Sequence, residues 1–173
     1  LSVSAGIPEQ IWQVVHGEAA TVGNAVTDNA DYVAFTGSTA TGKIVAQRAA
    51  SRLIGYSLEL GGKNPMIILP GADLEQAAEA AIGGAFGNSG QLCVAIERLY
   101  VPNHSLQEFE QVLKTRVESL SVGSSNEFDF DLGALTSANQ LERVSGFVER
   151  AVKEGAKVLT GGRALSEIGP NFY

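Results

Sequence analysis

The stretch YVAFTGSTATGKIVAQRAAS, residues 32–51, decides the fold class because its hydrophobic pattern changes from strand to helix at one glycine. Its first five residues form an apolar run that predicts a buried strand ending at Gly37. Ser38 can cap the helix that follows, which we expect to end at about Ser51. Further strands are predicted over 11–15 and 56–60, with a short helix over 18–26. This alternation favours parallel pairing and therefore an α/β fold.

The second half of the chain continues the alternation with longer helices. After the double glycine at 61–62, an apolar run predicts a strand over 65–69, and Asp73 can cap an alanine-rich helix. The tract from Gly83 to Cys93 has little periodicity, which is typical of a helix end that continues into a functional loop. Beyond it we predict strands over 99–101 and 157–160, helices over 106–120 and 139–153, an acidic loop over 123–133, and the start of a strand at 172–173.

Composition and charge exclude several classes of protein. With 45% hydrophobic and 18% charged residues among 173, the chain has the balance of a globular protein. Its net charge of −7 opposes a phosphate backbone, so no nucleic-acid partner is expected. Apolar runs such as 66–69 are too short to cross a bilayer, so no membrane partner is expected either.

Two further features bear on the cellular setting and on completeness. The single cysteine, Cys93, has no partner for an internal disulfide, and no basic-then-apolar leader is present, which together predict a reducing, cytoplasmic setting. The chain begins at Leu1 and stops at GPNFY, residues 169–173, where a turn leads into the start of a strand. We therefore expect a segment of a longer protein.

The run GSTATGK, residues 37–43, is a candidate phosphate site. Here a strand passes through glycine into a helix start, which leaves backbone N–H groups free for a phosphate. The run matches the first part of a P-loop, but Ile44 stands where a serine or threonine would hold Mg²⁺. An NTPase is therefore disfavoured, while phosphate or pyrophosphate binding stays open. The alternative is a plain turn in which Ser38 only caps the helix.

One thiol and one carboxylate are the candidate reactive side chains. Cys93 ends the run GNSGQLC, residues 87–93, whose small residues would let a substrate approach the sulfur. The alternative is a buried, inert thiol, and a cysteine-protease site lacks a convincing partner histidine. Glu59 interrupts an apolar strand, where a carboxylate is costly unless it is paired or used. It could form an ion pair with Lys63 or Arg98, or act as a general base.

Three motifs in a fixed order give the sequence a family resemblance. They are FTGST at 35–39, LELGGK at 58–63 and GQLC at 90–93. In this order and spacing they closely resemble the aldehyde dehydrogenase superfamily, and the similarity runs over essentially the whole chain. Residues 58–64 and 90–93, followed by 96–101, look most like the succinate-semialdehyde dehydrogenase group.

The resemblance implies a division into domains and a cofactor. Residues 1–61 would be the later part of a Rossmann-like, parallel-sheet NAD(P)-binding domain, and 62–173 the early part of the α/β catalytic domain. Gly37 and Ser38 would face the cofactor pyrophosphate, and Leu60 and Gly61 would lie near the nicotinamide. The cofactor would be NAD or NADP, and the parent protein would be a homo-oligomer.

The resemblance also implies a reaction. Cys93 would attack an aldehyde carbon, and the resulting oxyanion would be held partly by the Cys93 backbone N–H. Hydride transfer to the cofactor would leave a thioester, which water activated by Glu59 would hydrolyse. Because the CoA-acylating branch of the superfamily usually lacks a glutamate there, Glu59 favours a hydrolytic enzyme. The substrate would be a small aldehyde, such as succinate semialdehyde.

A second hypothesis comes from a different class of protein. The chain could be a non-catalytic nucleotide-binding or interaction module that keeps these motifs for packing. The family resemblance implies that the isolated segment is inactive, because the family's oxyanion asparagine and its ribose-binding lysine and glutamate would lie outside it.

Overall fold

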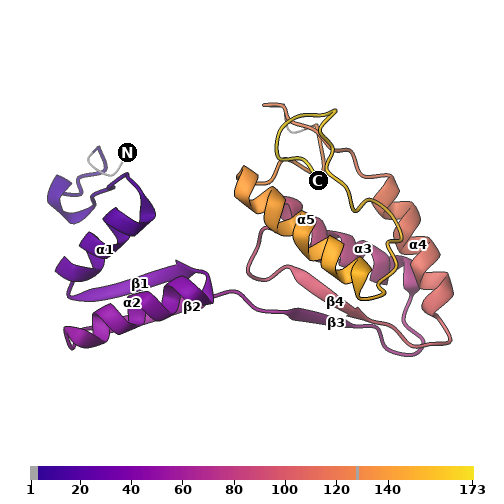
Figure 1. The fold of residues 1–173 in the computed structure, drawn as a ribbon, viewed down its shortest axis with the longest axis horizontal. Coiled ribbons are helices and arrows are strands. Elements are labelled where there is room, and N and C mark those ends of the chain that lie inside the picture. Colours follow the sequence, from indigo (N-terminus) through magenta and orange to yellow (C-terminus); the bar gives the residue numbers. More distant parts are fainter. Residues whose placement is uncertain (1–3, 128) are drawn as a thin grey trace. The chain divides into compact units, whose positions relative to one another are not determined.

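The computed structural model describes residues 4–127 and 129–173, and the chain forms two compact units. The first unit is Leu1–Gly61 and the second is Gly62–Tyr173 (Figure 1). Each unit contains one pair of parallel strands and its own helices. The expected α/β class with parallel pairing is therefore confirmed. The assignment of the two units to a cofactor domain and a catalytic domain stays a prediction.

The first unit is built on the strand–helix–strand pattern at 32–60. Its elements are the 3₁₀ helix η1 (Glu9–Ile11), helix α1 (Ala19–Asn29), strand β1 (Tyr32–Gly37), helix α2 (Thr39–Ser51) and strand β2 (Gly55–Leu60). Strands β1 and β2 pair in parallel from Tyr32 opposite Gly55 to Gly37 opposite Leu60. Helix α2 begins after Ser38, whose hydroxyl accepts a hydrogen bond from the Thr41 N–H at 3.2 Å. The predicted strand, cap and crossover helix are confirmed.

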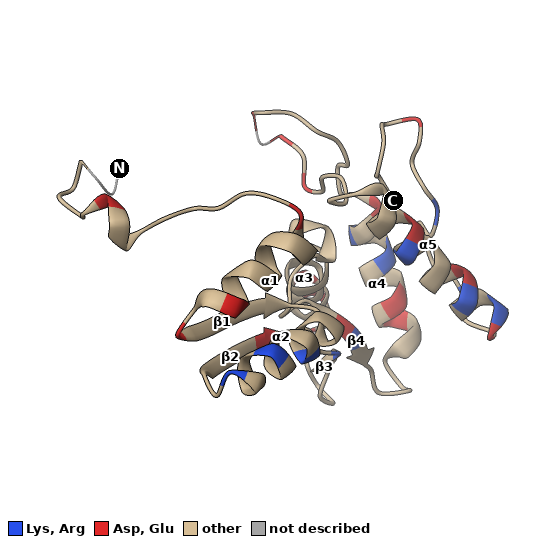
Figure 2. Cartoon of the chain, turned by 60° about the vertical axis from the view of Figure 1, so that its left-hand side comes forward, with Lys and Arg blue, Asp and Glu red and all other residues tan. Residues whose placement is uncertain are grey.

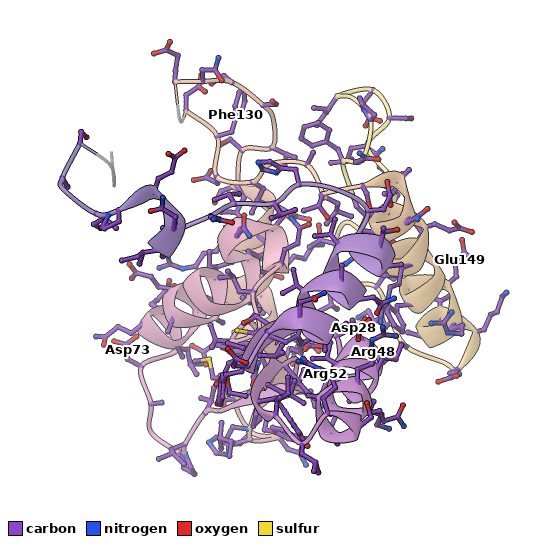
Figure 3. All side chains as sticks on the ribbon, turned by 90° about the vertical axis from the view of Figure 1, so that its left-hand side faces the viewer. Asp28, Arg48, Arg52, Asp73, Phe130 and Glu149 are labelled. Atoms are coloured by element: carbon purple, nitrogen blue, oxygen red, sulfur yellow. The ribbon has the colours of Figure 1, made fainter. Side chains whose placement is uncertain are left out.

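Polar contacts fix α1 against α2. The Arg48 guanidinium on α2 forms an ion pair with Asp28 on α1, with Nε donating to Oδ1 at 3.1 Å. Arg52 Nη1 donates to the carbonyls of Thr27 at 2.8 Å and Ala30 at 2.7 Å. Figure 3 shows Asp28, Arg48 and Arg52 gathered where the two helices meet. Arg52 thereby satisfies carbonyl groups that the end of α1 would otherwise leave without a partner.

The second unit packs helices against a short parallel pair. Its elements are strand β3 (Asn64–Ile67), helix α3 (Leu74–Phe86), the 3₁₀ helix η2 (Gly87–Gly90), strand β4 (Ile96–Tyr100), helix α4 (Leu106–Glu118) and helix α5 (Ala138–Lys153). Strand β3 pairs with β4 in parallel, with an irregularity between Asn64 and Pro65. Asp73 caps α3 as predicted, because its Oδ1 accepts from the backbone N–H groups of Glu75 and Gln76.

The core of the second unit lies where α3 and α4 cover the strand pair. Ile68, Ala78, Ala81 and Phe109 are almost fully buried and contact one another. Gly84 lets α3 approach β4 closely, since a Cβ placed on this glycine would come within 2.4 Å of Ile96 Cδ1. This close approach holds the carboxyl end of α3, where the cysteine loop begins, against β4.

Acidic and basic residues are intermixed on α4 and α5 (Figure 2). Two arginines on α5, Arg143 and Arg150, lie over the exposed ring of Phe147, with guanidinium carbons 5.7 and 4.8 Å from its centroid. Among residues 4–127 and 129–173, no helix combines the length and apolar content needed to cross a membrane.

Three predicted strand segments are wrong. Residues 11–15, 157–160 and 172–173 are not strands in this structure. A strand is stabilised by ladder hydrogen bonds to a neighbour, and the described residues provide no neighbouring strand for these runs. Ile11 and Trp12 are accordingly 72% and 70% exposed. Phe172 is buried, and its carbonyl accepts from the Leu165 N–H at 2.9 Å.

Candidate functional site

The predicted cofactor residues lie together at one edge of the first unit. Gly37 is the register partner of Leu60, so the carboxyl ends of β1 and β2 are side by side. Ser38 follows Gly37 and caps α2, whose first N–H groups therefore lie at the same edge. A Cβ placed on Gly42 would come within 2.7 Å of Leu60 Cδ2, so α2 lies directly against the end of β2. Gly61 follows Leu60 at this edge.

The P-loop alternative does not fit this geometry. A P-loop needs several non-helical residues whose N–H groups surround a phosphate. Here only Ser38 separates β1 from α2, and residues from Thr39 onward are already helical. The Gly42 N–H donates to the Ser38 carbonyl at 2.8 Å and is therefore used inside the helix. Only the first N–H groups of α2 remain for an anion.

Glu59 occupies an exposed position on β2, opposite Thr36 on β1. The expectation of a carboxylate enclosed in an apolar strand is therefore wrong, since this face of the strand is open. The ion-pair alternative is not formed either, because Lys63 pairs with Glu97 and no salt bridge to Glu59 occurs among the described residues. The carboxylate is therefore available for proton transfer.

The loop that carries Cys93 begins with an unusual backbone turn. After α3 ends at Phe86, Asn88, Ser89 and Gly90 adopt φ values of 52°, 55° and 71° in succession. Asparagine tolerates this left-handed region, but serine does so at a cost in conformational energy. Such strain persists only where neighbouring contacts enforce it, and it is frequent at functional sites.

Those contacts come from the segment that precedes α5. Ser89 Oγ donates to the Gly133 carbonyl at 2.9 Å. The Thr136 N–H donates to Gln91 Oε1 at 2.9 Å, and Gln91 Nε2 donates to the Asn88 carbonyl at 3.2 Å. The strained turn is therefore tied to a segment more than forty residues away in the sequence.

Cys93 is exposed on the far side of this turn. The alternative of a buried thiol is therefore wrong, and the reactivity of Cys93 stays a prediction. The Cys93 carbonyl accepts a hydrogen bond from Asn64 Nδ2 at 2.8 Å, and the same nitrogen donates to the Ala95 carbonyl at 3.0 Å. The Ala95 N–H in turn donates to the Leu92 carbonyl at 3.1 Å. The thiol is thus carried by an accessible but well-anchored backbone.

The structure brings together Gly37, Ser38, Leu60 and Gly61, and it places Glu59 on the same strand as Leu60. Cys93 belongs to the other unit, so its partnership with Glu59 stays a prediction. Asn64 and Gln91 lie inside the sequence motifs, but no role was predicted for them. The sequence feature that could have identified them is the carboxamide side chain. Its two donors and one acceptor allow it to hydrogen-bond several backbone groups of a loop.

Comparison with known proteins identifies the family. The aldehyde dehydrogenase family matches residues 1–173. A Mycobacterium tuberculosis protein provisionally named succinate-semialdehyde dehydrogenase (NADP+) 2 is 48% identical over 169 residues, which are 98% of this chain and 33% of that protein. A similarly named Mycolicibacterium smegmatis protein is 46% identical over 173 residues, 100% of this chain and 34% of that protein. The chain thus spans about a third of the length of the curated relatives it matches.

Solved structures agree with the sequence relatives. The succinate-semialdehyde dehydrogenase of Burkholderia pseudomallei superposes with a TM-score of 0.94 at 33% identity, over 99% of this chain and 36% of that one. A 3,6-anhydro-L-galactose dehydrogenase in complex with NAP gives a TM-score of 0.90 at 39% identity over the same shares. The expected resemblance is therefore confirmed: the chain belongs to the aldehyde dehydrogenase family.

Proposed function

We propose that the complete protein containing this chain oxidises a small aldehyde to the carboxylic acid with NAD(P)+, and that Cys93 is the nucleophile. The observation that carries the proposal is the exposed, lone thiol on a loop tied down from both sides. A nucleophile needs access for the substrate and a fixed backbone to orient it, and this loop supplies both.

The first unit fits a dinucleotide at the edge formed by Gly37, Ser38, Leu60 and Gly61. The α2 N-terminus favours an anion such as a pyrophosphate, because its first N–H groups have no acceptor inside the helix. Gly37 and Gly61 carry no side chain that would hinder close approach. When bound there, the nicotinamide ring supplies the hydride acceptor of the reaction. The first unit is thus proposed as part of the cofactor domain, and the second as part of the catalytic domain.

The chain's own residues carry the covalent chemistry. The Cys93 thiolate sulfur bonds to the aldehyde carbon, and the carbonyl electron pair moves onto oxygen beside the Cys93 N–H. Departure of hydride from that carbon leaves a thioester on the sulfur. Glu59 accepts a proton from a water molecule, whose oxygen attacks the thioester carbon. The carbon–sulfur bond then breaks, which releases the carboxylic acid and returns the thiolate.

The relatives support the substrate class. Because the Mycobacterium tuberculosis and Mycolicibacterium smegmatis proteins are named as NADP+-dependent succinate-semialdehyde dehydrogenases, we propose succinate semialdehyde as the first substrate to test and NADP+ as the first cofactor. Glu59 supports hydrolysis of the thioester over its transfer to CoA. A cytoplasmic location and a homo-oligomeric parent protein stay predictions.

The test is steady-state turnover of the complete natural polypeptide, followed as NADPH absorbance with succinate semialdehyde and NADP+. Cys93→Ala is expected to reduce turnover to background, because alanine has no sulfur to form the covalent bond to the aldehyde carbon. Asn103→Ala, in a surface turn of the second unit, is the matched control and is expected to keep full activity. Retained turnover in Cys93→Ala would overturn the proposal and favour the non-catalytic module. The isolated chain is expected to show no steady turnover.

A further inference from the structure

The side chain of Asn64 bridges two backbone carbonyls that flank the reactive thiol. Its Nδ2 donates to the Cys93 carbonyl at 2.8 Å and to the Ala95 carbonyl at 3.0 Å. Asn64 is the first residue of β3 and pairs with Ile96, the first residue of β4. Its short side chain therefore lies beside the residues just before Ile96 and contacts Ala95, one residue before it, and Cys93, three residues before it. Asn64 is half-buried, whereas Cys93 is exposed.

The local strand irregularity keeps this side chain in place. The register of the β3–β4 pair shifts between Asn64 and Pro65, and proline has no N–H to continue a regular ladder. A Cβ placed on Gly62 would lie 3.1 Å from Asn64 Oδ1, so the glycine leaves just enough room for the carboxamide. Bulges of this kind often redirect a side chain beside a functional site.

The bridge anchors the turn that sets the direction of the Cys93 N–H. This N–H shares its peptide unit with the Leu92 carbonyl, whereas Asn64 holds the carbonyls of Cys93 and Ala95, later in the same turn. The described residues contain no cis peptide bond, so the N–H and carbonyl of each peptide unit point in opposite directions. The Leu92 carbonyl is held by the Ala95 N–H at 3.1 Å, and the Cys93 and Ala95 carbonyls are held by Asn64. Both peptide units flanking Cys93 are therefore fixed. The Cys93 N–H has no acceptor among the described residues of its own unit, which leaves it free for a ligand.

We propose that Asn64 is a positioning residue: it anchors the Leu92–Ala95 turn, so that the Cys93 N–H points at the oxyanion that forms when the Cys93 sulfur attacks a carbonyl carbon. This inference rests on the proposed function of Cys93. This positioning role requires a side chain with two N–H donors, because two backbone carbonyls accept from the same side chain. Serine could hold one carbonyl, whereas aspartate has no donor at neutral pH and would repel both.

Two reactions of the complete natural polypeptide separate this role from a general effect on the thiol. p-Nitrophenyl acetate acylates the sulfur: the S–C bond forms, an oxyanion appears on the carbonyl oxygen, and nitrophenolate leaves as the C–O bond breaks. Iodoacetamide alkylates the same sulfur by displacing iodide and forms no oxyanion. Cys93 is the only cysteine of these 173 residues, and the same polypeptide with Cys93→Ala gives the background, so the difference between the two rates reports on Cys93.

Asn64→Ala is expected to lower the acylation rate constant about tenfold, less than the loss caused by deleting an oxyanion donor, because the N–H remains but the turn that directs it has lost its anchor. The alkylation rate constant is expected to change by less than about twofold, so the ratio of the two rates falls. Asn64→Ser is expected to give an intermediate ratio, because it keeps one donor. Asn103→Ala, in an exposed turn before α4, is expected to leave both rates unchanged.

A parallel fall in both rates in Asn64→Ser or Asn64→Ala would overturn the proposal, because it would indicate disruption of the whole loop. Unchanged rates in both variants would overturn it as well. Thermal unfolding of each variant checks the fold, and Asn64→Ser carries the test if Asn64→Ala does not fold. Failure of the proposed function has a different signature, namely dehydrogenase turnover that persists in Cys93→Ala, whatever the Asn64 variants do.

Discussion

Gln91 closes the cysteine loop, and its removal gives a measurable local opening. Its Oε1 accepts from the Thr136 N–H at 2.9 Å, and its Nε2 donates to the Asn88 carbonyl at 3.2 Å. The contact to the Ala134 carbonyl, at 3.5 Å, is too long to add much. Two net hydrogen bonds in a half-buried side chain contribute about 2 kcal/mol together. Gln91→Ala should therefore raise the population of the open loop about thirtyfold, taking about 1.4 kcal/mol for each factor of ten.

Native-state hydrogen exchange measured by NMR tests this figure at a single amide. Thr136 N–H should exchange about thirtyfold faster in Gln91→Ala, because local opening then precedes exchange more often. Gln91→Glu keeps an acceptor for this amide and should preserve most of its protection. Gln107→Ala, an exposed glutamine on α4, is the matched control. If Thr136 exchanges at the same rate in Gln91→Ala and the wild type, the side chain does not hold the loop closed, and the reasoning is refuted.

Three further predictions concern the core, the cofactor edge and the acidic loop. Phe109→Ala should lower the free energy of unfolding by about 3–5 kcal/mol because it leaves a cavity in the core of the second unit, and urea titration would contradict this with a loss below about 1 kcal/mol. Gly42→Ala should displace Leu60, whose Cδ2 would lie 2.7 Å from the new carbon, and should speed amide exchange along β2; unchanged exchange would oppose this. Hydrogen bonds from the Ser121 side chain and backbone lower the pKa of Asp131, so the carboxylate stabilises the fold above its ordinary titration range and loses this effect as pH falls through the lowered pKa. An NMR titration should show this low midpoint, and Ser121→Ala should move it back up; a midpoint at the ordinary value in the wild type would refute the assignment.

Local patterns in the sequence predicted the elements whose signals are local. Ser38 and Asp73 are found as helix caps because a cap needs only its own side chain and the next N–H groups. The strand that ends at Gly37 was predicted for a similar reason, since its apolar run and terminating glycine lie within six residues. By contrast, the apolar run at 11–15 is not a strand, because ladder hydrogen bonds need a partner that no local pattern supplies.

In the candidate site, too, local features could be predicted and contacts between distant residues could not. The edge around Gly37 and Leu60 was predictable because parallel strands end on the same side of a sheet. The anchors of the cysteine loop were not, because Asn64 meets Cys93 across 29 residues and Gln91 meets Thr136 across 45. The exposure of Glu59 was missed because the composition of a strand does not reveal whether its outer face is covered.

The central claim is that Cys93 carries a covalent acyl intermediate that Glu59 helps to hydrolyse. It is tested most directly by mass spectrometry of the complete natural polypeptide with Glu59→Gln, quenched in acid after incubation with succinate semialdehyde and NADP+. The proposed mechanism predicts that a succinyl thioester accumulates on the peptide containing Cys93, because glutamine cannot accept the proton from water. An unmodified Cys93 peptide in a variant that still produces NADPH at the wild-type rate would contradict it.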